Sequence, residues 1–236
     1  MISFYNAINC FTDCSIIKLK NGKKLAVAGY ISMYRGEILS AEYKPMYDCT
    51  NNFGELYGIY MGISNLVKWG RDSDKFLNLF SDSLISVNSL RDWIFKWRIE
   101  THNDLINKTG RVANQEIIKA IVCMVERSGY HMQLFHLLSH LNSSVPEQLW
   151  QVKNRFAELN NTILTDDITR EIMYYNSEVD HMTRDVGKRL VKDNMFDPYT
   201  YYKPYFINRV ITDGSIRNYR KLIRGEKEYG KIYSGN

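Results

Sequence analysis

Prolines and glycines are scarce in this chain of 236 residues, which holds four prolines and fourteen glycines. These low numbers exclude a collagen-like or low-complexity protein. No apolar run approaches the roughly 18 residues that would span a bilayer, and the N-terminal segment lacks the basic-then-apolar pattern of a signal peptide. We therefore expect a soluble, cytoplasmic protein with no membrane partner.

Cysteines are also few, and the four present are Cys10, Cys14, Cys49 and Cys123. They form neither a C-x-x-C pair nor the Cys/His spacing of a zinc site. Cys10 and Cys14 could form half of a metal site, but small buried thiols fit the pattern better. We expect free thiols in a reducing compartment, without disulfides.

Positive charge is concentrated near the C-terminus. Residues 186–236 contain 11 Lys or Arg and 5 Asp or Glu, whereas the other 185 residues contain 20 basic and 21 acidic side chains. A basic extension can steer a polyanion such as nucleic acid toward a neutral body. A solvated helical face that keeps the protein soluble explains the charge equally well.

Apolar periodicity predicts an α/β protein, with a mixed sheet of five strands flanked by helices. The strands are expected at 8–17, 25–33, 37–43, 76–80 and 131–138. Helices are expected at 52–69, 86–98, 114–127 and 167–192, the last with an interruption near Tyr175, and a polar loop is expected at 100–110. A further helix is predicted to begin near residues 144–147.

Three acids fall at positions typical of a metal site. Asp13 lies inside an apolar strand, where an unpaired charge is costly. Glu55 lies in the first turn of the first helix, and Asp82 follows the fourth strand, at the kind of edge where α/β sheets bind ligands. Each acid alone is more often an ion pair or a cap, but carboxylates together suit a hard cation such as Mg²⁺ or Mn²⁺.

Ordered motifs over about residues 8–190 resemble the type 1 ribonuclease H family. The motifs are FTDCS at 11–15, TNNFGE at 50–55, SDS at 81–83 followed by Trp93 and Trp97, Asn114 at a helix start, and NSEVDHMTR at 176–184. The first is similar to the family's D-G-S with Cys in place of Gly, and the second to its T-N-N-x-x-E. The last is similar to N-E-x-x-D-x-x-A-R.

The resemblance implies a ribonuclease H-like catalytic domain over residues 1–192. It also implies an inserted helical segment at about 141–170, because a family histidine after the fifth strand fits His140 but lies much further from Asp180 than in relatives. His136 is expected to be a strand residue. Residues 193–236 are then a basic, tyrosine-rich extension.

The resemblance also implies the chemistry. Asp13, Glu55, Asp82 and Asp180 are expected to hold two Mg²⁺ ions, with Mn²⁺ as a substitute, and His140 to assist proton transfer. The implied reaction is hydrolysis of the RNA strand of an RNA–DNA hybrid, leaving 5′-phosphate and 3′-hydroxyl ends.

Substrate contacts follow from the same motifs. Asn51 and Asn52 match groups that reach the minor groove, where the 2′-hydroxyl distinguishes RNA from DNA. Thr50 and Asn114 match groups that bind a phosphate of the DNA strand. Trp97 matches an aromatic residue beside the DNA strand, although core packing explains it equally well.

Two other classes of function remain open on sequence grounds. The same fold occurs in resolvases, integrases and exonucleases that cut DNA, and a non-catalytic nucleic-acid binding module could share it. The T-N-N motif favours hybrid cleavage, and four acids facing a polyanion argue against a pure binder. The extension is expected to grip substrate, and the competing hypothesis is that it docks a replication protein.

Overall fold

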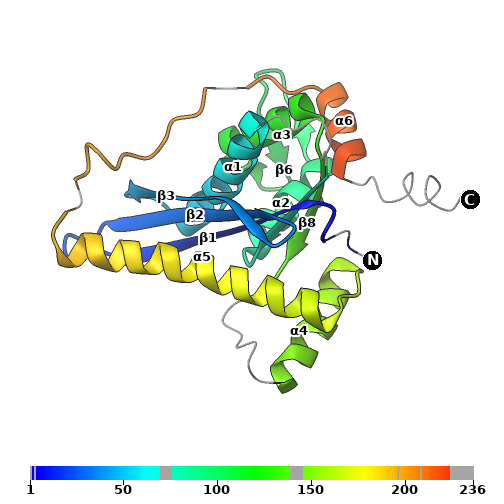
Figure 1. Ribbon diagram of the computed structural model, residues 1–236. Coiled ribbons are helices and arrows are strands. Elements are labelled where there is room, and N and C mark those ends of the chain that lie inside the picture. Colours follow the sequence, from blue (N-terminus) through cyan, green and yellow to red (C-terminus); the bar gives the residue numbers. More distant parts are fainter. Residues whose placement is uncertain are drawn as a thin grey trace, which may run out of the picture.

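A five-stranded mixed sheet forms the centre of the computed structural model, which describes residues 2, 4–69, 76–138, 146–195, 197–207 and 209–223 (Figure 1). The strands are β1 (Ile8–Lys18), β2 (Lys24–Tyr34), β3 (Glu37–Tyr47), β4 (Phe76–Ser81) and β8 (His131–His136). Their order is β3-β2-β1-β4-β8. β1, β2 and β3 pair antiparallel, and β4 and β8 continue parallel to β1. The predicted mixed sheet is confirmed.

Alternating side chains of β1 divide the core into two layers. Cys10 and Cys14 belong to the larger apolar cluster, on the face that α1 (Asn51–Trp69) and α3 (Gln115–Ser128) cover. Phe11 belongs to the second cluster, on the face that α5 (Asp166–Lys192) covers. All four cysteines are free and buried, as predicted.

A stripe of glycines lets α1 lie close against the sheet. Gly54, Gly58 and Gly62 recur every four residues and so share one face of the helix. A Cβ atom at Gly58 would stand 3.0 Å from the carbonyl oxygen of Gly29 in β2, and one at Gly54 would stand 2.2 Å from the Sγ of Cys14. Glycine is therefore needed at these positions for the helix that carries Glu55 to keep its distance from β1.

Two helices depart from their predicted form. α2 (Leu84–Arg91) ends seven residues early, because Asp92 leaves helical geometry at φ −127° and the 3-10 turn Trp93–Phe95 carries Ile94 into the core. α5 is continuous through the predicted interruption, since the Tyr175 ring stacks on Phe11 at 5.5 Å and is held against the sheet.

The predicted loop at 100–110 contributes to a second, small sheet. Its strands are β5 (Arg98–Ile99), β6 (Leu105–Asn107) and β7 (Gly110–Arg111), which pair antiparallel. Gln115 holds this sheet to α3, since its side-chain oxygen accepts a hydrogen bond of 2.7 Å from the backbone N–H of Leu105. Pairs this short carry too weak a sequence signal to separate from a loop.

The helix predicted to begin near residues 144–147 is present as α4 (Pro146–Asn160), which packs against α5 and β8. The described part of the extension leaves the end of α5, crosses the molecule and includes α6 (Asp213–Ile223), which lies beside α3 (Figure 1). No helix among the described residues is long and apolar enough to cross a membrane.

Candidate active site

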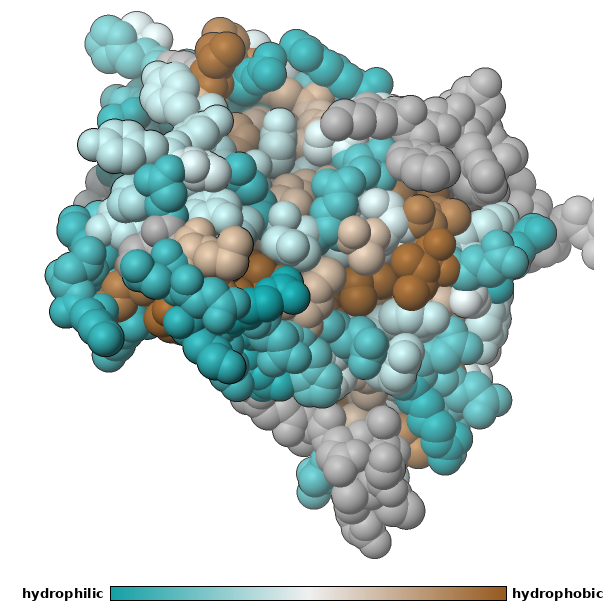
Figure 2. Space-filling model, turned by 60° about the vertical axis from the view of Figure 1, so that its left-hand side comes forward, coloured by the Kyte–Doolittle hydropathy of each residue, from teal (hydrophilic) through white to brown (hydrophobic). Residues whose placement is uncertain are grey.

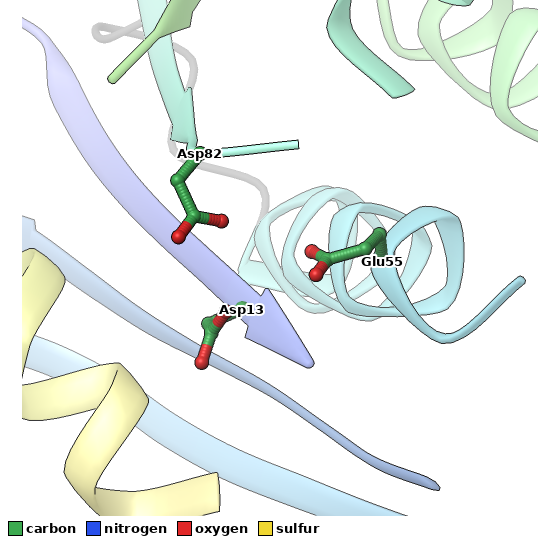
Figure 3. A group of neighbouring side chains, drawn as sticks. All are labelled: Asp13, Glu55 and Asp82. Atoms are coloured by element: carbon green, nitrogen blue, oxygen red, sulfur yellow. The ribbon is translucent and has the colours of Figure 1, made fainter. Parts of the chain in front are cut away.

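Three carboxylates meet where β1 and β4 separate. Parallel pairing of the two strands ends at Thr12 and Ser81, so the next residues, Asp13 and Asp82, lie side by side at the opening. α1 contributes Glu55, whose carboxylate is turned toward Asp13 and Asp82 (Figure 3). One carboxylate oxygen from each lies within 4.8 Å of the others. The predicted grouping of these three acids is therefore present.

The environment of these acids favours a bound cation. Asp13 is 7% exposed and Glu55 is 4% exposed. Burial, together with the charges of Asp82 and Asp180, raises the pKa of Asp13 to about 6. Burial and the neighbouring acids raise the pKa of Glu55 well above its usual range. Glu55 Oε2 is buried without a hydrogen-bond partner in the described part of the chain. A hard cation would satisfy this oxygen and offset the repulsion, so the residues fit a divalent metal ion.

Thr183 of α5 holds Asp13 in place. Its hydroxyl donates a hydrogen bond of 3.1 Å to Asp13 Oδ2, and it also lies 3.0 Å from the hydroxyl of Ser15. Sequence reasoning did not single out Thr183. The signal was present, because Thr183 stands where the family motif has Ala, and a hydroxyl there can reach the first-strand carboxylate.

Asp180 lies outside the group of three. It projects from α5 and lines a small cavity of about 50 Å³ together with Asp82. Its carboxylate pairs with Arg184 at 3.0 Å, and its charge contributes to the raised pKa of Asp13. The fourth acid of the predicted quartet therefore faces the same opening from the other side.

His136 supports the backbone of Asp82. Its Nε2 lies 3.1 Å from the Asp82 carbonyl oxygen, which only accepts hydrogen bonds, so Nε2 carries the proton. Burial lowers the pKa of this ring and keeps it neutral at pH 7. His136 is a strand residue, as predicted, but its contact with Asp82 was not.

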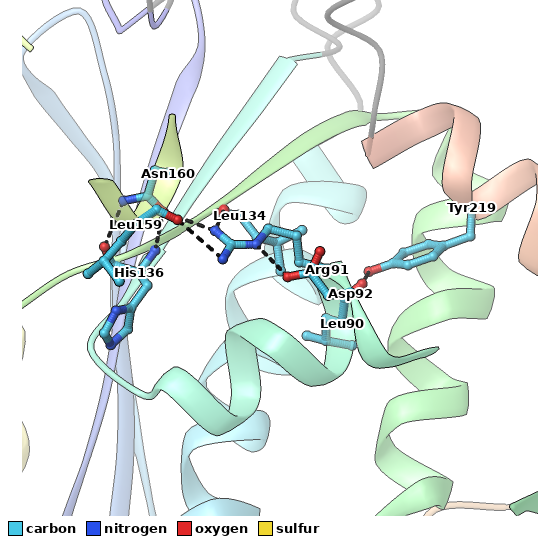
Figure 4. Close-up of polar contacts among 8 residues, drawn as sticks. All are labelled: Leu90, Arg91, Asp92, Leu134, His136, Leu159, Asn160 and Tyr219. Atoms are coloured by element: carbon cyan, nitrogen blue, oxygen red, sulfur yellow. Dashed lines mark hydrogen bonds and ion pairs between the residues drawn. The ribbon is translucent and has the colours of Figure 1, made fainter. Parts of the chain in front are cut away.

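Hydrogen bonds join α4 to β8, the strand that carries His136 (Figure 4). The side chain of Asn160, at the end of α4, accepts from the N–H of His136 at 2.9 Å and donates to its carbonyl at 2.9 Å. Arg91 of α2 donates to Asn160 Oδ1 at 3.0 Å and to the Leu134 carbonyl at 3.3 Å. This network could not be predicted, because it joins residues of three elements that are far apart in sequence.

The predicted substrate-binding residues surround the first turns of α1 and α3. Thr50 caps α1 by accepting from the N–H of Phe53 at 3.3 Å. The Asn51 side chain partly offsets the rise in the pKa of Glu55, and Asn52 is exposed. Asn114 begins α3 in a left-handed conformation, and its side chain does not cap the helix.

Trp97 and His140 stand apart from this arrangement. Trp97 is partly buried and packs against the main core, which agrees with the packing interpretation. His140 lies outside the described residues, as do its neighbours 139–145.

The sheet order, the helices on its two faces and the acids at the opening between β1 and β4 define a ribonuclease H-like fold. A profile of the RNase H family matches residues 5–158, and the chain belongs to this family. Asp13, Glu55 and Asp82 fall within the match, whereas Asp180 lies beyond it.

Curated relatives point to the same family. The chain is 29% identical over 110 residues to the Ribonuclease H proteins of Tropheryma whipplei strains Twist and TW08/27. The aligned region covers 46% of this chain and 65% of those relatives.

Solved structures share the fold at low sequence identity. A foamy viral protease–reverse transcriptase in complex with an RNA/DNA hybrid superposes with a TM-score of 0.51 and 14% identity, over 68% of this chain and 20% of that chain. A foamy viral protease–reverse transcriptase in complex with dsDNA gives 0.50 and 15%, over 68% of this chain and 96% of that one.

Proposed function

We propose that this protein is a metal-dependent endonuclease that hydrolyses the RNA strand of RNA–DNA hybrids. The observation that carries the proposal is the convergence of Asp13, Glu55 and Asp82 within 4.8 Å, at the opening of a ribonuclease H-like sheet. Membership of the family and a viral structural neighbour solved with an RNA/DNA hybrid support the choice of substrate.

The metal is Mg²⁺, with two ions per site and Mn²⁺ as a substitute. Asp13, Glu55, Asp82 and Asp180 would hold it, because carboxylate oxygens are the ligands that a hard cation prefers. When bound, such a pair of ions activates water for in-line attack on a phosphodiester and stabilises the leaving 3′ oxygen.

The side chains around the acids hold them in position. Thr183 fixes the Asp13 carboxylate, and His136 fixes the backbone of Asp82. Such pre-set geometry lowers the reorganisation needed for reaction. His140 is proposed to assist proton transfer, and the products are 5′-phosphate and 3′-hydroxyl ends.

The test compares three labelled substrates of one sequence: an RNA–DNA hybrid, duplex DNA and single-stranded RNA. The proposal expects Mg²⁺-dependent cleavage of the RNA strand of the hybrid alone, with products that carry a 5′-phosphate. Cleavage of duplex DNA with the hybrid left intact would assign the site to DNA instead. Binding of all three without cleavage would indicate a nucleic-acid binding module.

A further inference from the structure

One described segment of the extension, residues 197–207, lies along the body, and we call this segment the strap. The backbone N–H of Tyr47 in β3 donates to the Tyr201 carbonyl of the strap. Further along, the Phe206 ring meets Tyr60 of α1 edge-on, with ring centroids 4.9 Å apart. Beyond the strap, Ile211 is buried, and the Tyr219 hydroxyl donates to the Leu90 carbonyl at 3.0 Å. The strap is therefore held at both ends.

Between these anchors the strap places Lys203 against the first turn of α1. Its Nζ lies 4.1 Å from the centroid of the Phe53 ring, two residues before Glu55. A cation over an aromatic face is attracted to the ring and loses rotamer freedom. Pro204, the next residue, further restricts the backbone. Lys203 thus presents a pre-positioned ammonium group beside the first turn of α1, the helix that also carries Glu55.

A pocket of about 300 Å³ opens beside this ammonium group. Its walls come from the start of α1, from Arg111 of β7, from the start of α3 with Asn114, and from strap residues 203–206. Three segments distant in sequence, one of them the extension, are needed to form it.

The charges around the pocket leave Lys203 uncompensated. Glu116 is paired with Lys119 at 3.1 Å, and Arg111 is paired with Asp104 at 3.1 Å. In the part of the chain that the structure describes, Lys203 has no acidic partner within 4.0 Å. Asp48, the acid before Cys49 at the end of β3, is already paired with Lys23 at 2.6 Å. The charged residues that line the pocket are Arg111, Glu116 and Lys203, so the lining carries one net positive charge.

We propose that Lys203, which the extension brings to this pocket, is an additional ligand for a backbone phosphate of the nucleic-acid substrate, beside Asn114, whose counterpart in the family binds a phosphate of the DNA strand. This inference rests on the proposed function, because it assumes that nucleic acid approaches this face. An ammonium group and a side-chain amide with no capping role are donors suited to a phosphodiester oxygen. The side of the molecule turned forward in Figure 2 is mostly hydrophilic, with hydrophobic groups right of its centre and near its edges.

The experiment compares the full chain with three variants: Lys203→Gln, Lys203→Arg and Lys221→Gln. Lys221 is an exposed lysine of α6 in the same extension, and it controls for general loss of positive charge. Hybrid affinity is measured without divalent metal over a range of salt concentrations. Loss of one phosphate contact lowers the slope of log affinity against log salt by about 1 and weakens binding by about threefold or more. We expect this for Lys203→Gln, full recovery in Lys203→Arg, and a smaller change for Lys221→Gln.

A second arm locates the phosphate. Hybrids carrying one neutral methylphosphonate linkage, at each position of the DNA strand or of the RNA strand in turn, are bound to wild type and to Lys203→Gln. One methylphosphonate linkage should lower the affinity of wild type as much as the Lys203→Gln substitution lowers it. The same linkage should not lower the affinity of Lys203→Gln any further. That linkage identifies the strand.

The outcomes separate the two proposals. If wild type neither binds nor cleaves hybrid, the proposed function fails. If wild type does both, but Lys203→Gln and Lys221→Gln lose equal affinity or no methylphosphonate couples to Lys203, only the phosphate site is overturned. Unchanged affinity in every variant would instead leave the extension free for a protein partner.

Discussion

Replacing Asp13 by asparagine should stabilise the metal-free protein at neutral pH. The folded protein raises the pKa of Asp13 from 3.8 to about 6, through burial and the charges of Asp82 and Asp180. A rise of about two pKa units means that the ionised carboxylate lowers the stability of the folded protein by about 3 kcal/mol at a pH where the group is ionised in both states. An uncharged amide avoids this cost and can still accept the hydrogen bond from Thr183.

The pH dependence of this effect follows from the direction in which folding shifts the pKa of Asp13. Because the folded pKa lies above the unfolded one, protonation stabilises the folded state. This stabilisation is complete below about pH 4 and is lost as the pH rises through about 6. The gain from Asp13→Asn should therefore be near 3 kcal/mol at pH 7.5 and small at pH 4, so the difference between the two conditions isolates this carboxylate.

Thermal or urea unfolding in EDTA at the two pH values measures the effect. For a chain of this size, about 3 kcal/mol raises the midpoint of thermal unfolding by about 6–12 °C. The control is Asp185→Asn, at an exposed position of α5, which should stay within about 0.5 kcal/mol of wild type. Equal stability of Asp13→Asn and wild type at pH 7.5, or the same gain at both pH values, would refute the electrostatic reasoning.

Three further variants test how the site is supported. Gly58→Ala places a Cβ 3.0 Å from the Gly29 carbonyl oxygen. Unfolding measurements should therefore show a stability lower by about 1–3 kcal/mol, and the cleavage rate should fall because α1 moves. Unchanged stability and rate would show that α1 accommodates the added methyl group. Asn160→Ala leaves the N–H and carbonyl of His136 unpaired, which should lower kcat more than it changes KM. An unchanged kcat would show that this hydrogen-bond network does not affect catalysis. His140→Ala should slow turnover about 10- to 100-fold without changing metal affinity, and a silent substitution would place proton transfer elsewhere.

The sequence predicted the central sheet and the grouping of three acids at its edge, because both depend on local patterns. Asp13 interrupts an apolar strand and Asp82 follows another, so the strand periodicity itself indicated that they share an edge. Glu55 was predictable from the T-N-N motif at the start of a helix. These three residues lie on the elements that the pattern defines most strongly.

The contacts that the sequence did not predict are long-range. His136 and Asn160 meet only because α4 returns to the edge strand, and no local pattern encodes that return. Lys203 reaches Phe53 after the chain has crossed the molecule, so charge counting showed a basic extension but not its location. The early end of α2 depends on burial of Ile94, which helical periodicity alone places inside a longer helix.

The most direct test of the central claim is the single-turnover rate of hybrid cleavage in Mg²⁺ by wild type and by Asp13→Asn, with hybrid affinity measured in parallel. We predict that wild type cleaves the RNA strand, and that the variant is folded, binds hybrid normally and cleaves at least about a hundredfold more slowly. A folded Asp13→Asn protein that cleaves within about tenfold of wild type would contradict the assignment of this carboxylate cluster as the metal-binding catalytic centre.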